Sequence, residues 1–189
     1  MHVRAIPLVL LLFAFVQADY ARDAITLGRT TDEALFDAFN NGYMLSPSGE
    51  IERAEIITEF RRAVLLVRER VRQGVFAITE RDVTTDVEKY RGLVTFVVQL
   101  RLHPLNTYAT TPSYDLYVST GRSSRPIGAD KMKRDPVFAP GTKPGIAGIR
   151  LEASFPRAEI EAAPAPLLVV TDDQGNAIWQ AHLDLSRFR

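Results

Sequence analysis

Residues 93–102 read LVTFVVQLRL, and this stretch decides the fold class. Every second position carries an apolar side chain: Val94, Phe96, Val98, Leu100 and Leu102. The positions between them include Thr95, Gln99 and Arg101. Because successive side chains of a strand point to opposite faces, this alternation predicts a strand with one buried face.

Similar strand patterns continue toward the C-terminus. The further predicted strands cover residues 114–119, 149–155, 167–171 and 177–185. Residues 167–171 are apolar on both faces, which is typical of a central strand. Residues 172–176 include Gly175 and are predicted to form a hairpin turn. Short strands with turns of this kind predict an antiparallel sheet of about five strands.

Upstream of residue 93 the period is helical. We predict helices at about residues 31–41 and 50–73, and a short helix at 82–90. In the second helix, Ile56, Phe60, Ala63, Val64, Val67 and Val71 recur at spacings of three and four. Gly74 then stands where glycine favours a helix end. Residues 63–67 are apolar nearly all round, so this helix should be covered on more than one side.

Helices followed by strands are typical of the α+β class. We expect the N-terminal helices to pack on the C-terminal antiparallel sheet. The alternative is a β-sandwich with a helical N-terminal appendage. Residues 19–189 are predicted to form a single domain, with a helical part at 19–92 and a β part at 93–189. Residues 19–29 are predicted to be an extended opening segment.

The first 18 residues, MHVRAIPLVLLLFAFVQA, predict a secretory signal peptide. Arg4 supplies the positive start, and residues 5–16 form an uncharged, mostly apolar run. As a helix this run spans about 18 Å, too short for a hydrocarbon core of about 30 Å. Val16 and Ala18 fit the small-residue pattern of a cleavage site after Ala18. We therefore expect an exported protein, periplasmic or secreted, with no transmembrane segment after cleavage.

Composition excludes several classes of protein. The chain has no cysteine, so disulfide scaffolds, thiolate nucleophiles and iron–sulfur clusters are excluded. It has 23 basic and 23 acidic residues, and this balance argues against general binding of nucleic acid. Hydrophobic residues make up 46% of the chain, too many for a wholly disordered protein.

The segment 120–148 is the leading candidate for a binding site. Its many prolines and glycines predict a long irregular loop, and long loops are often functional. Residues 120–147 hold six basic and two acidic residues, a surplus of four positive charges. The candidate binding residues are Arg122, Arg125, Lys131, Lys133 and Arg134, which suit an anionic ligand or partner surface. A solvated loop is the alternative interpretation.

Two tyrosines near the first predicted strand are further candidates. Tyr108 and Tyr114 could help to line a site for a small molecule, since aromatic faces and polar tips suit such ligands. Packing at a strand edge is the alternative interpretation of both residues.

Catalytic and metal-binding patterns are scarce. After cleavage only His103 and His182 remain, too few for a zinc site without other clustered ligands. His182 is predicted to face solvent. No Walker A or G-x-G-x-x-G motif occurs, so we predict neither a nucleotide cofactor nor a resident metal. Glu159 and Glu161 would share one face if they lay on a strand, where solubility is the ordinary explanation for paired carboxylates.

These observations favour a non-enzymatic cell-envelope protein that binds a partner protein or a small anionic ligand, and not nucleic acid. One alternative is a hydrolase that uses scattered carboxylates without a readable motif. The other is a structural protein that assembles through the apolar middle of helix 50–73. A pocket holding two carboxylates about 5–10 Å apart would favour the hydrolase.

Overall fold

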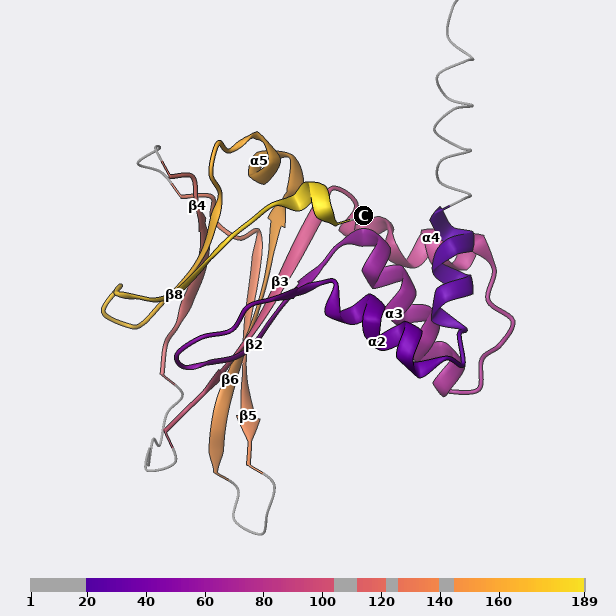
Figure 1. Cartoon of the computed structure of the whole chain (residues 1–189), viewed down its shortest axis with the longest axis horizontal. Coiled ribbons are helices and arrows are strands. Elements are labelled where there is room, and N and C mark those ends of the chain that lie inside the picture. The colour runs from indigo at the N-terminus through magenta and orange to yellow at the C-terminus, as the bar shows by residue number, and fades with distance from the viewer. Residues whose placement is uncertain (1–19, 104–111, 122–125, 140–144, 189) are drawn as a thin grey trace, which may run out of the picture. The chain divides into compact units, whose positions relative to one another are not determined.

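The computed structural model describes residues 20–103, 112–121, 126–139 and 145–188, which form two compact units (Figure 1). Of the described residues, 20–40 and 59–91 make up the helical unit. The β unit comprises residues 41–58 and the described residues from 92 onward. Residues 41–58 thus belong with the strands, although they precede most of the helical sequence.

The helical unit is built from short amphipathic helices. Residues 20–28 are helical, followed by α2 (Glu33–Asn41), α3 (Glu59–Arg72) and α4 (Glu80–Val87), with the 3-10 turn η1 (Glu88–Tyr90). Thr79 caps α4, because its side chain accepts a hydrogen bond from the Asp82 amide while the Asp82 carboxylate accepts one from the Thr79 amide. This reciprocal pairing satisfies two backbone donors at the helix start.

The helical unit has its own hydrophobic core. The buried members are Ala21, Ala24, Ile25, Phe36, Phe60, Ala63, Val64, Val67, Ile78, Val83 and Val87. Arg68 closes one side of this core, since its guanidinium donates to the Thr30 carbonyl and to Glu33 and lies 4.5 Å from the Phe36 ring centroid. In the apolar middle of α3, Ala63, Val64 and Val67 are fully buried in this core, while Leu65 and Leu66 are half-buried.

The β unit contains two antiparallel sheets. The five-stranded sheet has the order β1-β2-β3-β6-β5, formed by β1 (Met44–Leu45), β2 (Ile51–Ile57), β3 (Leu93–Arg101), β6 (Ile146–Pro156) and β5 (Lys131–Phe138). The three-stranded sheet has the order β4-β7-β8, formed by β4 (Asp115–Ser119), β7 (Leu167–Thr171) and β8 (Ala177–His182). Helix α5 (Arg157–Ala162) follows β6, and the 3-10 turn η2 (Leu185–Arg187) follows β8.

Each sheet buries one apolar face. In the five-stranded sheet, the Phe96 and Phe155 rings meet edge to face with centroids 5.7 Å apart. In the three-stranded sheet, Val170 pairs with Trp179, and both side chains are buried. Figure 1 shows the two sheets beside each other within this unit. The buried faces form the core of the β unit.

Much of the predicted architecture is confirmed. The fold is α+β with antiparallel sheets. Residues 93–101 form β3, and residues 167–171 form β7, the central strand of its sheet. The strands predicted at 114–119 and 149–155, the hairpin turn with Gly175 at φ 82°, and the short helix near 82–90 are also present. The strands are divided between two sheets, with five strands in the larger one.

The predicted helix 50–73 is wrong in its first third. Residues 51–57 form β2, which pairs with β3, and the helix begins only at Glu59. Ala54 and Ile56 are buried and fit a strand of period two as well as a helix of period 3.6. A bulge between Ile51 and Arg53 shifts the register, which hides the alternation at the start of the strand.

The prediction of an extended segment at residues 19–29 is also wrong, because residues 20–28 are helical. Ala21, Ala24, Ile25 and Gly28 lie on the buried face of this helix. Three of these four side chains are very small, so their helical spacing produced little hydrophobic signal in the sequence.

The predicted irregular loop at 120–148 contains a strand, β5, and part of another, β6. Within it, Ile127 also forms a bridge with Val118 of β4. The pattern of β5 was hidden because an edge strand needs only one partner and carries polar side chains and proline. Residues 157–162, which include Glu159 and Glu161, form helix α5 and not a strand.

Candidate binding edge at strand β5

The described candidate residues gather around β5. Lys131, Lys133 and Arg134 lie on β5, while Tyr114 immediately precedes β4. The candidates Tyr108, Arg122 and Arg125 lie outside the described residues. The structure therefore allows a geometric description of four of the seven candidates, and three of these share a single strand.

Strand β5 lies at one edge of the five-stranded sheet and pairs only with β6 among the described strands. It is eight residues long, and most of its side chains are exposed. The opposite edge is β1, which has only two residues. Strand β5 is therefore the long open edge of this sheet, with backbone groups that no described strand satisfies.

Hydrogen bonds at the ends of the β3–β6 pair establish which backbone groups of β6 face which neighbour. The Leu102 amide donates to the Ala147 carbonyl, and the Arg157 amide donates to the Gly92 carbonyl, each at 2.8 Å. Both bonds continue the β3–β6 register. The odd-numbered residues of β6 therefore direct their backbone groups toward β3, and the even-numbered ones direct theirs toward β5.

The same alternation establishes the open side of β5. The register pairs the even-numbered residues of β6 with Lys131, Lys133, Asp135 and Val137. The backbone groups that face away from β6 consequently belong to Met132, Arg134 and Pro136. Proline has no amide hydrogen to donate. The Pro136 nitrogen faces the open edge, so no hydrogen bond between β5 and β6 is lost.

The side chains of β5 alternate between the two faces of the sheet. Met132, Arg134 and Pro136 stand opposite Ala153, Leu151 and Ile149, which are buried in the core of the β unit. Lys131, Lys133 and Asp135 therefore point to the outer face, and all three are exposed. Phe138, at the end of the strand, is 60% exposed.

Arg134 connects the two sheets of the β unit. Its Nε donates to the Tyr114 carbonyl at 2.8 Å, and one Nη donates to the Asp115 carboxylate on β4. The guanidinium is therefore already engaged within the β unit. Tyr114 itself is 9% exposed. A ligand-binding role for either residue stays a prediction, and the structure shows a structural role for Arg134.

Lys131 and Lys133 are different, since neither forms an ion pair or side-chain hydrogen bond with any described residue. In the register, Lys133 stands opposite Glu152 and Asp135 stands opposite Arg150. Glu152 and Arg150, however, pair with each other along β6 at 3.7 Å. The two lysine ammonium groups consequently remain available to an anionic partner.

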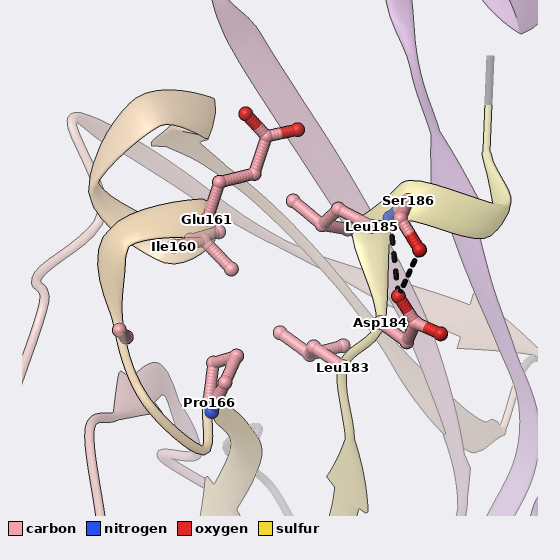
Figure 2. Close-up of a pocket in the computed structure, with 8 residues that line it drawn as sticks. Ile160, Glu161, Pro166, Leu183, Asp184, Leu185 and Ser186 are labelled. Atoms are coloured by element: carbon pink, nitrogen blue, oxygen red, sulfur yellow. Dashed lines mark hydrogen bonds between the residues drawn. The ribbon is translucent and has the colours of Figure 1, made fainter.

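The hollow between α5 and η2 brings two carboxylates near an apolar floor (Figure 2). It has a volume of about 440 Å³, and Ile160, Leu183 and Leu185 help to line it. Its carboxylates are Glu161 and Asp184. Glu161 accepts a hydrogen bond from Arg157 at 2.7 Å, and Asp184 accepts two from the amide and hydroxyl of Ser186. Both groups therefore serve local structure.

A second hollow, in the helical unit, is lined by Arg22, Arg29 and Arg81. Arg22 pairs with Glu80 at 3.2 Å. Arg29 donates to the Phe76 and Ile78 carbonyls at 2.6 and 3.2 Å. Arg29 thus holds the connection between α3 and α4, and Arg22 is paired with the first residue of α4.

The carboxylates with displaced pKa values lie at turns and caps. The Thr79 hydroxyl and amide lower the pKa of Asp82, and the Asn176 side chain with turn amides lowers that of Asp172. Neither lies on β5 or in the hollow of Figure 2. Both effects come from hydrogen bonds to the ionised carboxylate, which favour its charged form.

Among the residues that the structure describes, no group of three or more His, Asp or Glu side chains is placed to hold a metal ion. No helix in these parts of the chain is long and apolar enough to cross a membrane. His182 is exposed at the end of β8, as predicted.

Comparisons of the chain with protein-family models, with curated proteins and with solved structures find no match. What the chain binds is therefore inferred from the geometry of β5. Sequence reasoning selected its lysines by charge but missed the open edge to which they belong. One indication was present, since lysines and a proline within one short segment are compatible with an edge strand.

Proposed function

We propose that this chain is an exported, non-enzymatic protein that binds an anionic partner protein of the cell envelope through β5. The observation that carries the proposal is the pair Lys131 and Lys133, exposed on an open edge and without an ion-pair partner among the described residues. Export rests on the predicted signal peptide.

Electrostatics support such a role. Charged groups at a binding surface increase the rate of encounter with an oppositely charged partner and select against like-charged ones. The two lysines point to the same face two positions apart, so one extended partner can meet both. No conformational change or released ion pair is needed before they bind.

Binding is preferred over hydrolysis for a specific reason. The described hollow that holds two carboxylates uses both in structural hydrogen bonds. Self-assembly through the middle of α3 also lacks a supporting observation, since Ala63, Val64 and Val67 are fully buried in the helical unit.

The test compares capture of envelope proteins by the exported chain and by Lys131→Glu/Lys133→Glu. We expect the charge reversal to reduce recovery of the specific partner by about tenfold, because two favourable ion pairs become repulsive. Quantitative mass spectrometry of cross-linked complexes provides the measurement.

Two control variants sharpen this test. Lys89→Glu changes a lysine of the helical unit and should leave recovery unchanged. Asp135→Lys adds positive charge to the outer face of β5 and should increase recovery. Equal recovery of the partner by the wild-type chain and by the double variant would show that the charge of β5 is not used in binding. Recovery of only a small anionic molecule would show that the ligand is such a molecule and not a protein.

A further inference from the structure

We infer that β5 binds an extended acidic segment of its partner as an additional strand of the five-stranded sheet. This inference rests on the proposed function and specifies how the partner is recognised. It requires an open edge, backbone groups that point outward, and side chains that select the added strand.

The backbone of β5 meets the first two requirements. The amides and carbonyls of Met132 and Arg134, together with the Pro136 carbonyl, face away from β6, as the register establishes. These groups alternate as donors and acceptors along one line, which is the arrangement that an incoming strand pairs with. With eight residues, β5 is long enough to guide such a strand.

Two of the outer-face side chains, Lys131 and Lys133, then favour acidic side chains in the added strand, while the third charged side chain on this face is Asp135. Because the backbone groups of Lys131 and Lys133 face β6, an antiparallel strand added on the open side meets both lysines at non-hydrogen-bonded positions. Opposing side chains are closest at such positions, with Cα atoms about 4.5 Å apart. Acidic side chains at positions i and i+2 of the partner would lie opposite the two ammonium groups and pair favourably with them.

A second copy of this chain fits the edge less well. Two copies of β5 can pair antiparallel around a central residue that stands opposite itself. Centring this pairing on Lys133 or Asp135 brings two like charges together, which destabilises a strand pair. Centring it on Arg134 places Lys133 opposite Asp135 of the other copy but leaves Lys131 opposite Val137. Each of these registers leaves at least one lysine without an acidic partner, so an acidic segment of another protein is the favoured occupant.

The test uses a blocked eight-residue peptide of alternating glutamate and valine as the probe, added to the chain 19–189. Amide hydrogen exchange followed by NMR reports on each β5 residue. At a peptide concentration about ten times its dissociation constant, we expect exchange at Met132 and Arg134 to slow by about tenfold, because only unbound protein exchanges there. The inward amides of Lys131, Lys133 and Asp135 should change little.

Two matched peptides separate strand pairing from charge attraction. A lysine–valine peptide should bind at least about tenfold more weakly, because its charges repel the lysines. A glutamate–valine peptide N-methylated on the amides of one edge keeps its charge but cannot pair through that edge. If it binds as tightly as the parent, recognition is by charge alone and the strand-addition inference is wrong.

Protein variants test the same point from the other side. Met132→Pro removes an outward amide hydrogen and should abolish peptide binding, whereas Met132→Ala shortens the same side chain, keeps the amide and should bind. The peptide variants keep the inference testable if Met132→Pro unfolds.

The remaining outcomes are also decisive. Absence of glutamate–valine binding, or binding without slower exchange at Met132 and Arg134, overturns strand addition while the capture experiment still judges the proposed function. If the exchange of these two amides slows as the protein concentration increases, without any peptide, the occupant of the edge is a second copy of this chain. That result would overturn the inference of an acidic partner.

Discussion

At the scale of single residues, Gly28 illustrates how closely the helical unit is packed. A Cβ atom at this position would lie 2.7 Å from the Val67 Cβ and 2.8 Å from the Val64 carbonyl oxygen. Real Cβ atoms do not approach other atoms so closely, and the nearest obstacles include backbone. Helix 20–28 therefore packs against α3 at a distance that only glycine permits.

We predict that Gly28→Ala lowers the free energy of unfolding by about 1–3 kcal/mol, the usual cost of overpacking a core. Urea unfolding followed by circular dichroism measures the change. Gly128→Ala is the matched control, since a Cβ there meets no atom within 4 Å. Equal stability of Gly28→Ala and the control would show that the two helices separate at little cost.

The carboxyl group of Asp82 makes the stability of the fold depend on pH. Hydrogen bonds from the Thr79 hydroxyl and amide lower the pKa of its carboxyl below the ordinary value of 3.8. A group whose pKa is lower in the folded state stabilises the fold above its unfolded pKa. That contribution is lost as pH falls through the folded pKa.

We therefore predict that Asp82→Asn destabilises the chain at about pH 7 and that the deficit shrinks toward about pH 3. Chemical unfolding across this range measures it. Asp173→Asn alters an exposed carboxylate that makes no hydrogen bond with the described residues, and its deficit should stay near zero throughout. A deficit for Asp82→Asn that is the same at both ends of the range would contradict the argument.

At the scale of elements, Arg134 connects strands of different sheets. It joins β5 to β4 through the Tyr114 carbonyl and the Asp115 carboxylate. Its side chain is 39% exposed, so solvent weakens the ion pair. These Arg134 contacts nevertheless help to order β5, an edge strand that has only one neighbour in its sheet.

We predict that Arg134→Met lowers the free energy of unfolding by about 1 kcal/mol. A hydrogen bond to a charged group contributes more than this when it is buried, and solvent reduces the contribution here. Amide exchange should also become faster along β5 while β7 keeps its protection. Arg134→Lys should recover only part of the loss, because an ammonium cannot match the planar fork of the guanidinium. Unaltered exchange on β5 would show that pairing with β6 alone orders this strand.

Element boundaries show where local patterns succeed. Strand β3 was predictable because apolar residues recur at every second position from Val94 to Leu102, as a buried face requires. Its second face is also covered in the structure, where Thr95 and Val97 are buried. Strand β2 was not, because Ala54 and Ile56 suit either period and a bulge interrupts the start of the strand. Pairing with β3, about 40 residues away in the chain, favours the strand over the helix for residues 51–57.

At the scale of the whole molecule, overall neutrality conceals local imbalance. The 23 basic and 23 acidic residues cancel over the chain, yet residues 120–147 carry four surplus positive charges. The structure arranges part of this surplus on one face of an edge strand. With no cysteine in the chain, packing and hydrogen bonding hold both units without a disulfide.

For the whole chain we predict that export removes residues 1–18. The exported product should begin at Asp19 and contain 171 residues, since 18 of the 189 are removed. Ala21 and Ala24 are fully buried, so a product that began after them would lose part of the helical core. Intact mass spectrometry of the exported protein measures the start.

Ala18→Arg is the matching control, because signal peptidase requires a small residue there. This variant should remain in its precursor form. An exported protein that retained residues 1–18, or an Ala18→Arg variant processed normally, would contradict the predicted cleavage site.

The candidate site was predictable only in part. Charge alone selected Lys131 and Lys133, because an excess of basic residues is visible in any sequence. Arg134 looked equivalent to them, yet it is engaged in a contact with residues near β4. Such contacts join positions that are remote in the chain, so no local pattern reveals which cation is engaged and which is available.

Local period and turn chemistry are enough to predict the α+β class, the antiparallel sheets, the hairpin at Gly175 and strands β3 and β7. They are not enough to predict that residues 51–57 form a strand, that residues 20–28 form a helix or that β5 is an open edge. Strand pairing supplies the reason. Whether a short polar segment becomes a strand, and which of its backbone groups remain open, depends on a partner elsewhere in the chain.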